Sequence, residues 1–417
     1  MKHIEKWSVV LLLSITDAFP TNTKRPPKRS PWTNLGAIGS AQKTLDKTFD
    51  YDEDLTQSTY VQIITADLTT LALDLRKSYD NIFYDPRQPN EKRFAFDPWV
   101  VHAGDGLSAA NKRKDPPENV TVKDDNNSTP GEVDATARQI QYSLKRAQLS
   151  QILDDSQYED MIDALSRLGQ SIGCSCITPP WLSIYTHGDM QNFHTDAPHG
   201  PLAFVFSLTL NEDYGNKFTG GETMLMRPSI LDYWRNFNDE VGLETPSIMR
   251  YIPPTFGRCI AFDPKIPHGV TPVFGTNDPR HCRVVIHGWF AQPETTFFGD
   301  FEDDPEAKAE VLAVLNESLE PLIEALGTGE IGRVCGYLAV KIDFDEKNGS
   351  VSQCSAVCDT LVADPEDYRG VVGQDMEGRD VFEDPVSDVK LTVEENLGSI
   401  QISDGLSGSI VVPFVFT

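Results

Sequence analysis

Four apolar runs of strand length stand in the middle of the chain. They are rich in β-branched and aromatic residues, which favour strands, and Gly, Pro, Asn and Asp residues separate them. The runs cover residues 181–185, 203–210, 259–262 and 284–290. Short strands divided by turn residues predict a sheet packed on a sheet, as a barrel or a sandwich, rather than a βαβ fold.

Two histidines and an aspartate lie in this region at a spacing that suits a metal ion. His194 and Asp196 are two positions apart, so on a strand their side chains fall on one face, and His268 follows 74 positions after His194 (268 − 194). Two neutral imidazoles and one carboxylate form the three-point face that holds non-haem Fe(II) and leaves the opposite face open for a co-substrate and O₂. The sequence therefore predicts these three residues as ligands of iron.

An arginine follows the second histidine at the start of the last apolar run. Arg283 carries a forked, permanently charged guanidinium, the group suited to holding the distal carboxylate of a dicarboxylate co-substrate. Arg280, in the turn-like segment 277–282, is a second candidate for this anchor.

These motifs resemble, over residues 180–292, the Fe(II)- and 2-oxoglutarate-dependent dioxygenases and, among them, the prolyl 4-hydroxylase-like branch. The basic residue of that branch stands six positions before a tryptophan, as Arg283 does before Trp289 (289 − 283). A tyrosine, Tyr185, lies nine positions before His194 (194 − 185). A glycine-rich turn at 218–223 and the segments 256–262 and 267–272 are also similar to the branch.

The resemblance implies a mainly β fold with flanking helices, built on a double-stranded β-helix (jelly-roll, cupin-like) core. It implies Fe(II), with 2-oxoglutarate and O₂ as co-substrates and ascorbate as reductant. Arg283 and Tyr185 would bind 2-oxoglutarate, and no catalytic residue is expected beyond the metal ligands. The Tyr185 ring could instead pack in the core with its hydroxyl on a backbone group.

The implied reaction is hydroxylation of a C–H bond, in a prolyl residue of a protein or in a small molecule, with release of succinate and CO₂. Asp196 speaks against halogenation, because the halogenating relatives carry a small residue at this position. Demethylation and epoxidation on the same scaffold stay open. A different alternative is a non-catalytic jelly-roll binding protein whose C-terminal β domain mediates interactions.

Five regions are expected along the chain. A targeting segment (1–45) precedes a helical support region (46–170) with helical apolar spacing at 55–79, 140–153 and 161–168 and an exposed loop at 104–135. The dioxygenase jelly-roll (171–300), a linking helix (301–330) and a small β-rich domain (331–417) follow. The last domain either docks a protein partner or buttresses the fold.

An inserted helix between Pro228 and Pro253 is a candidate substrate lid. Its aromatic and basic side chains, Tyr233, Trp234 and Arg235, are therefore candidate substrate contacts; the alternative is a helix that packs its aromatic side chains on the barrel. Four other histidines near the motif are left out of the ligand set, because a histidine on a half-buried strand is commonly a core or rim residue: His187, His199, His281 and His287.

Charge and the N-terminal residues bear on partners and location. A net charge of −27 argues against a nucleic-acid partner, whose phosphates would be repelled. Residues 8–15 form a short apolar core of the signal-peptide type, too short to span a bilayer, and no transmembrane segment is expected. Residues 19–45 contain no Asp or Glu and resemble a transit segment. The secretory pathway or ER lumen is the expected location, with plastid delivery through a bipartite signal as the alternative.

Overall fold

The computed structural model describes most of the chain beyond residue 140. The described residues are 9–10, 61–64, 68–84, 87, 95–102, 140–196, 199–210, 217–227, 248–328, 333–363, 371–374, 380–382 and 385–416. The exposed loop predicted at 104–135, most of the predicted targeting segment, and Tyr233, Trp234 and Arg235 lie outside them.

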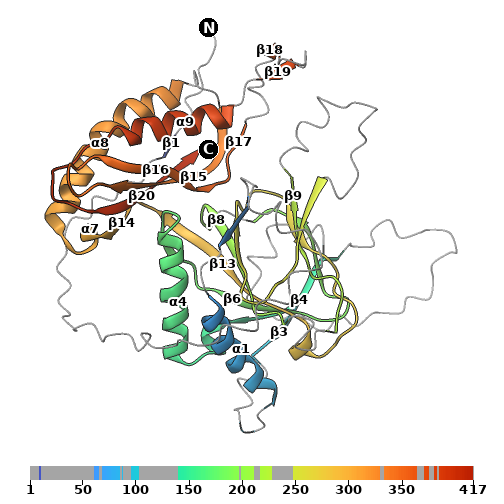
Figure 1. Cartoon of the computed structure of the whole chain (residues 1–417). Coiled ribbons are helices and arrows are strands. Elements are labelled where there is room, and N and C mark those ends of the chain that lie inside the picture. The colour runs from blue at the N-terminus through green and yellow to red at the C-terminus, as the bar shows by residue number, and fades with distance from the viewer. Residues whose placement is uncertain are drawn as a thin grey trace, which may run out of the picture.

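A curled, antiparallel sheet of twelve strands forms the central unit, as predicted for a jelly-roll core (Figure 1). Its order is β10-β9-β12-β7-β4-β6-β13-β8-β11-β2, with β3 beside β4 and β5 beside β13. The strands are β2 (Val61–Ile64), β3 (Asp97–His102), β4 (Ile140–Gln148), β5 (Cys174–Ile177), β6 (Trp181–Tyr185), β7 (Met190–His194), β8 (Leu202–Ser207), β9 (Thr223–Met226), β10 (Met249–Ile252), β11 (Cys259–Phe262), β12 (His268–Val270) and β13 (Arg283–Pro293). β10 and β11 are far apart in this order yet line one pocket, which shows how strongly the sheet curls.

Alternation along β13 defines the inside and the outside of the barrel. Val284 and Ile286 point outward, into a core shared with helices α1 (Thr69–Tyr84) and α4 (Asp155–Gln170). Val285 points inward and packs with Tyr185, so Arg283 and His287, at odd positions of the same strand, also face the interior.

Two of the helical segments expected before residue 170 are wrong in whole or in part. Residues 140–148 form strand β4, followed by the short 3₁₀ helix η1 (Leu149–Gln151). The apolar spacing there was compatible with a helix, but this segment hydrogen-bonds with β3, β6 and β7, and that tertiary pairing overrides local pattern. Likewise the helix predicted at 55–79 begins only at Thr69, because the β-branched residues before it form β2 along the edge of β11.

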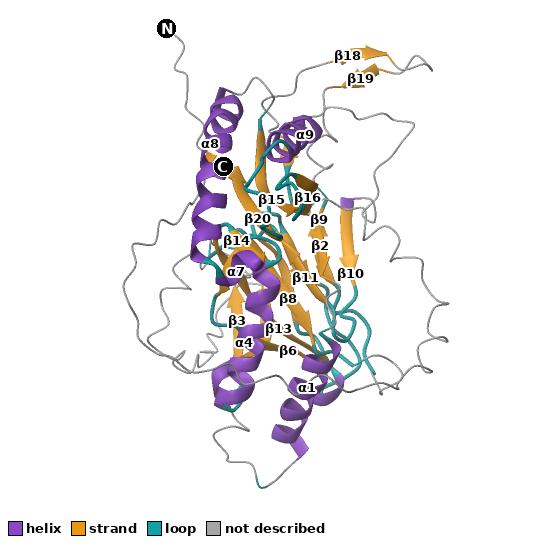
Figure 2. Cartoon of the chain, turned by 60° about the vertical axis from the view of Figure 1, so that its left-hand side comes forward, coloured by secondary structure: helices purple, strands orange, loops and turns teal. Residues whose placement is uncertain are grey.

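The C-terminal unit is a six-stranded sheet with helices on one face. Its strands are β1 (Val9–Val10), β14 (Thr296–Gly299), β15 (Val334–Phe344), β16 (Val351–Asp359), β17 (Val362–Ala363) and β20 (Gly408–Phe416). Helix α7 (Asp300–Asp303) leads into α8 (Pro305–Thr328), which with α9 (Pro385–Gly398) covers the sheet (Figure 2). β18 (Val371–Gln374) and β19 (Asp380–Phe382) form a separate pair.

The two faces of this sheet bury different partners. Leu338 and Val340 pack with Leu315 of α8, whereas Tyr337 and Ala339 belong to the same core as the outside of the barrel. The helices therefore lie on the side of the sheet away from the barrel (Figure 1). The C-terminal unit is thus packed against the barrel across one of its two faces.

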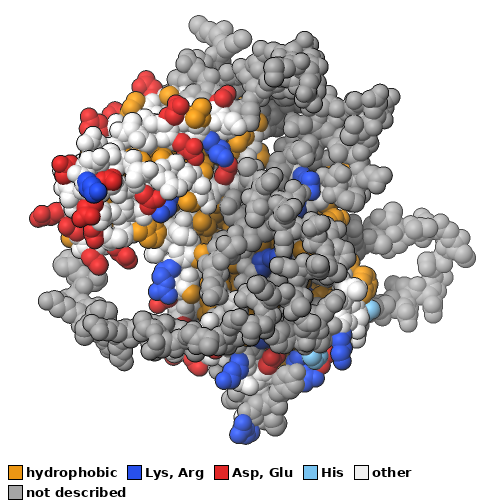
Figure 3. Space-filling model, in the orientation of Figure 1, with side chains coloured by type: hydrophobic (Ala, Val, Ile, Leu, Met, Phe, Trp, Pro, Cys, Tyr) orange, Lys and Arg blue, Asp and Glu red, His pale blue; other side chains and the backbone are white. Residues whose placement is uncertain are grey.

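Acidic side chains gather on the exposed surface of this unit (Figure 3). Helix α8 contributes several of them, among them Glu306, Glu317, Glu320 and Glu324. Such a face repels a phosphate backbone. Within the described part of the chain, no helix is both long and apolar enough to cross a membrane.

Replacing Tyr337 with Phe should weaken the joint between the two units. The Tyr337 hydroxyl is buried and donates a hydrogen bond to the Ile172 carbonyl at 2.7 Å. Its loss leaves a buried acceptor without its donor, which costs about 1–3 kcal/mol. Thermal unfolding should show the drop, whereas Tyr158→Phe on α4 should stay within about 0.5 kcal/mol of the parent. An unchanged melting temperature in Tyr337→Phe would show that the joint does not depend on this bond.

Candidate metal centre

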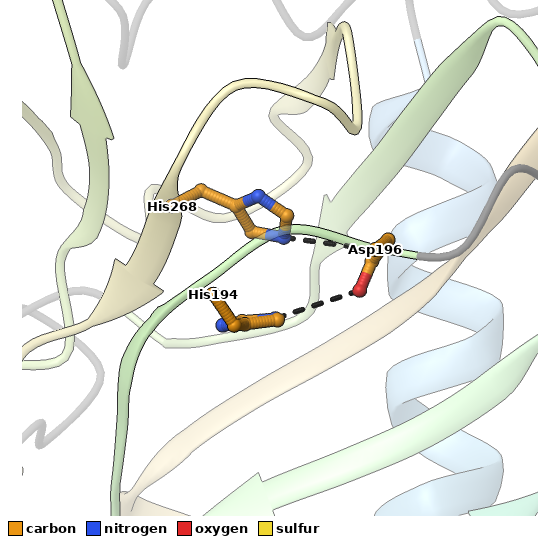
Figure 4. A group of neighbouring side chains, drawn as sticks. All are labelled: His194, Asp196 and His268. Atoms are coloured by element: carbon orange, nitrogen blue, oxygen red, sulfur yellow. Dashed lines mark ion pairs between the residues drawn. The ribbon is translucent and has the colours of Figure 1, made fainter. Parts of the chain in front are cut away.

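Strands β7 and β12 bring the three predicted metal ligands together. His194 and His268 are directly opposite each other in the antiparallel pair, and Asp196 lies two residues beyond the end of β7. The main-chain N–H of Asp196 donates to the Pro264 carbonyl at 3.0 Å, which fixes the aspartate beside β12. One ligand atom from each of the three residues lies within 4.8 Å of the other two (Figure 4).

Backbone carbonyls determine which nitrogen of each imidazole is available. Nδ1 of His194 donates to the Asn192 carbonyl at 2.8 Å, and Nδ1 of His268 donates to the Ile266 carbonyl at 2.8 Å. A carbonyl only accepts, so in each neutral ring Nδ1 carries the hydrogen and Nε2 carries the lone pair. Both lone pairs are thereby turned to the same place, in the arrangement that outer hydrogen bonds impose on metal-binding histidines.

The three groups have no hydrogen to share when the imidazoles are neutral. Asp196 Oδ1 lies 3.5 Å from His194 Nε2, and Oδ2 lies 3.6 Å from His268 Nε2 (Figure 4). Burial raises the pKa of the Asp196 carboxyl, and the two imidazoles lower it to well below its usual range only when their Nε2 atoms are protonated and donate to it. A carboxylate facing two lone pairs requires a cation, and the donor set of two nitrogens and one oxygen fits Fe(II).

A β-bulge gives the centre its shape. His268 pairs with His194, but Val270 pairs with Gln191, so two residues of β7 oppose the single Gly269 of β12. Such bulges re-aim side chains next to active sites. Here the bulge places Gln191 and His194 on the same side of β7 although they are three positions apart, and the Gln191 amide touches the His194 ring.

Gly269→Ala should therefore disturb both stability and metal binding. A Cβ at this position would lie 2.5 Å from the Gln191 carbonyl oxygen, so β7 must shift. We expect a loss of about 1–3 kcal/mol in unfolding free energy, the usual cost of overpacking, together with weaker metal binding in calorimetry. Gly327→Ala, where a Cβ meets nothing within 4 Å, is the control and should be neutral or slightly stabilising. Equal behaviour of the two variants would contradict this account.

Arg283 is buried and lines a small pocket of the barrel. Thr223, Ser207 and Ile260 line the same pocket. Arg283 Nη2 donates to Thr223 Oγ1 at 3.2 Å, while among the described residues Nε and Nη1 have no hydrogen-bond partner. Burial lowers the pKa of Arg283. A buried guanidinium with two unused donor positions has the charge and the donors that a carboxylate would satisfy.

The rival anchor, Arg280, is already engaged elsewhere. It lies in the 3₁₀ turn η3 (Pro279–His281), and its Nε and Nη2 donate to the Asp278 carboxylate at 2.8 and 2.6 Å. It does not line the pocket, and about a third of its side chain is exposed. The geometry therefore favours Arg283 as the anchor.

Tyr185 connects the anchor with the metal ligands. Its ring lies against the Arg283 guanidinium, 4.6 Å from Cζ, and its hydroxyl donates to Gln191 Oε1 at 3.1 Å. The hydroxyl is thus bonded to a side chain, not to the backbone. Burial raises the pKa of Tyr185, so the phenol stays protonated and remains a donor.

His287 is an interior residue that the sequence did not predict as part of the site. Its Nε2 lies 2.9 Å from Ser183 Oγ and 3.4 Å from Arg146 Nη2. Burial, with Arg146 nearby, lowers the pKa of His287 to about 3, so this imidazole is neutral at physiological pH. The available clue was the alternation along β13, which puts His287 on the same face as Arg283. The His199 ring meets the Trp289 ring in an edge-to-face arrangement, with centroids 4.6 Å apart, and His199 is not among the clustered ligands.

Comparison with known proteins gives weak similarities. No family model and no curated protein matches the chain. One similar solved structure is a prolyl hydroxylase from Trichoplax adhaerens, in complex with a peptide fragment of the hypoxia inducible factor oxygen degradation domain. It is 12% identical to this chain, with a TM-score of 0.32, and the match covers 57% of this chain and 86% of that chain. A prolyl-4-hydroxylase from Pseudomonas putida is 12% identical, with a TM-score of 0.28, over 58% and 96%. An oxidoreductase of the 2OG-Fe(II) oxygenase family from Burkholderia pseudomallei is 15% identical, with a TM-score of 0.30, over 57% and 88%.

Proposed function

We propose that this protein is an Fe(II)- and 2-oxoglutarate-dependent dioxygenase. One observation carries the proposal: two imidazole lone pairs and a carboxylate converge inside a barrel that also buries an arginine with unused donors. His194, Asp196 and His268 would hold the metal and leave its other positions open. Arg283 would bind the distal carboxylate of 2-oxoglutarate, with Tyr185 beside it.

The residues of the chain would bind and orient the co-substrate and shield the site from water. The iron, when bound, would supply the O₂ activation that converts 2-oxoglutarate to succinate and CO₂ and places oxygen in a C–H bond. The backbone bonds of His194 and His268 keep both imidazoles in the binding tautomer. Asp196 remains ionised and offsets the charge of the cation. Apolar interior side chains such as Val285 and Phe262 limit the access of water to this region.

The proposed reaction is hydroxylation of a prolyl residue of a protein or of a small molecule, with ascorbate as reductant. The sequence motifs shared with the prolyl 4-hydroxylase-like branch support this choice. Demethylation and epoxidation are the other outcomes that the same site would allow. We also propose that the protein acts in the secretory pathway, because its N-terminal residues resemble a signal peptide. For the C-terminal unit we propose a docking role in addition to its packing on the barrel.

The test is formation of succinate from 2-oxoglutarate. The purified protein is supplied with Fe(II), ascorbate, O₂ and 2-oxoglutarate, and succinate is measured by mass spectrometry. We expect slow turnover without a substrate and faster turnover with one, which untargeted comparison of products from candidate extracts would reveal. Absence of both iron binding and succinate formation would instead favour a non-catalytic binding protein.

A further inference from the structure

Gln191 links the two ends of the proposed co-substrate site. It lies on β7, next to the bulge, and is half-buried. Its Nε2 is 3.0 Å from His194 Nε2, and its Oε1 accepts from the Tyr185 hydroxyl at 3.1 Å. Tyr185 in turn lies against the Arg283 guanidinium. One amide therefore stands between a metal ligand and the residues that form the carboxylate anchor.

The orientation of this amide follows from its neighbours. His194 Nδ1 donates to a carbonyl, so Nε2 of the neutral ring is an acceptor, and the group facing it must be the NH₂ of Gln191. The oxygen of the amide then faces the Tyr185 hydroxyl, which can donate to it. Both contacts agree on one orientation.

The His194 lone pair can serve only one partner. It either accepts a hydrogen bond from Gln191 or binds a metal ion, so metal binding releases the Gln191 NH₂. The released amide is still held through its oxygen by Tyr185. A donor then becomes available beside the metal, on a side chain that Tyr185 connects to Arg283.

Successive contacts through Gln191 and Tyr185 link His194 to Arg283, so a dicarboxylate held at both ends would pass these two side chains. We propose that Gln191 is a co-substrate-binding residue: its NH₂ occupies His194 before the metal arrives and afterwards donates to an oxygen of 2-oxoglutarate near the metal. The inference rests on the proposed function. It also predicts an order, because the donor is free for 2-oxoglutarate only after the metal has bound, and the two affinities are then coupled.

The experiment measures Mn(II) and 2-oxoglutarate binding by anaerobic calorimetry, with Mn(II) as the metal probe. In Gln191→Leu, we expect 2-oxoglutarate to bind the Mn(II)-loaded protein roughly tenfold or more weakly, the effect of losing one hydrogen bond to a charged group. Mn(II) itself should bind as tightly as to the parent protein, or more tightly, because no amide competes for His194. Turnover is not needed for either measurement.

Two further variants complete the design. Gln157→Leu is the matched control, because the Gln157 amide donates to Ser78 Oγ at 2.6 Å and Gln157 is not part of the cluster; both affinities should be unchanged. Gln191→Glu keeps the acceptor for Tyr185 but replaces the donor with a negative charge. It should bind Mn(II) more tightly and 2-oxoglutarate more weakly, and it covers the case in which the leucine variant fails to fold.

The outcomes separate this inference from the proposed function. If the parent protein binds Mn(II) and 2-oxoglutarate but Gln191→Leu and Gln191→Glu bind 2-oxoglutarate as the parent does, only the inference is overturned. Weaker Mn(II) binding with unchanged 2-oxoglutarate binding would overturn it as well, since Gln191 would then support His194. A parent protein that binds neither probe would overturn both.

Discussion

His194→Ala should remove metal binding while the fold stays intact. The imidazole would supply one of the three ligands of the proposed site, and its loss would leave two. Since removal of an outer-sphere partner alone costs about 10–100-fold in metal affinity, loss of a ligand should cost at least about a hundredfold. Calorimetry with Mn(II) measures the affinity, and succinate formation should disappear with it. His194 is half-buried and Asp196 loses a facing lone pair, so we expect little change in melting temperature.

The control for this variant is His187→Ala. His187 is close in sequence, but its Nδ1 accepts from the Gly275 N–H at 3.2 Å and its ring contacts Phe274. It is not part of the cluster. Normal Mn(II) affinity in His194→Ala, or an equal loss in both variants, would refute the assignment of His194 as a ligand.

Arg283→Leu should abolish productive binding of 2-oxoglutarate without unfolding the protein. A two-pronged contact to a carboxylate consists of charged hydrogen bonds of about 1.5–3 kcal/mol each, so the dissociation constant should rise about a hundredfold or more. Stability should stay equal or increase, because a buried guanidinium with unused donors is costly. Binding of 2-oxoglutarate to the Mn(II)-loaded protein and thermal unfolding together test both parts.

Arg280→Leu is the matched control, since it removes the same group from the turn just before β13. Its guanidinium is held by Asp278, so 2-oxoglutarate binding should be unaffected. If the effects were reversed, with Arg280→Leu losing 2-oxoglutarate and Arg283→Leu keeping it, the anchor would be the arginine of the turn.

Sequence patterns were sufficient for much of the barrel and for the ligand set. The strand predicted at 181–185 is β6, and those at 259–262 and 284–290 correspond to β11 and to part of β13. Continuous apolar runs were enough there because both faces of these strands are largely buried, as in β11, where every residue is buried. The His-x-Asp spacing predicted that His194 and Asp196 share one face of a strand, and His268, 74 positions after His194, was predicted as the third ligand. The structure brings all three residues together.

Other features could not be read from local patterns. Strand β4 looked helical because its pairing partners come from distant parts of the chain. The contact between Gln191 and His194 depends on a register shift opposite Gly269, and nothing in the sequence marks that bulge. His287 looked like an ordinary core histidine because the polar groups around it come from β4 and β6.

The junction between the barrel and the C-terminal sheet limits how the protein can be shortened. The chain passes from β13 directly into β14, which pairs with β20 near the end of the sequence. A polypeptide cut after Gly299 would retain β14 without its neighbour and would uncover apolar groups such as Ile172 and Cys174. A fragment that lacks the residues after Gly299 is therefore not expected to be soluble, and the barrel and the C-terminal sheet should be expressed and engineered as one piece.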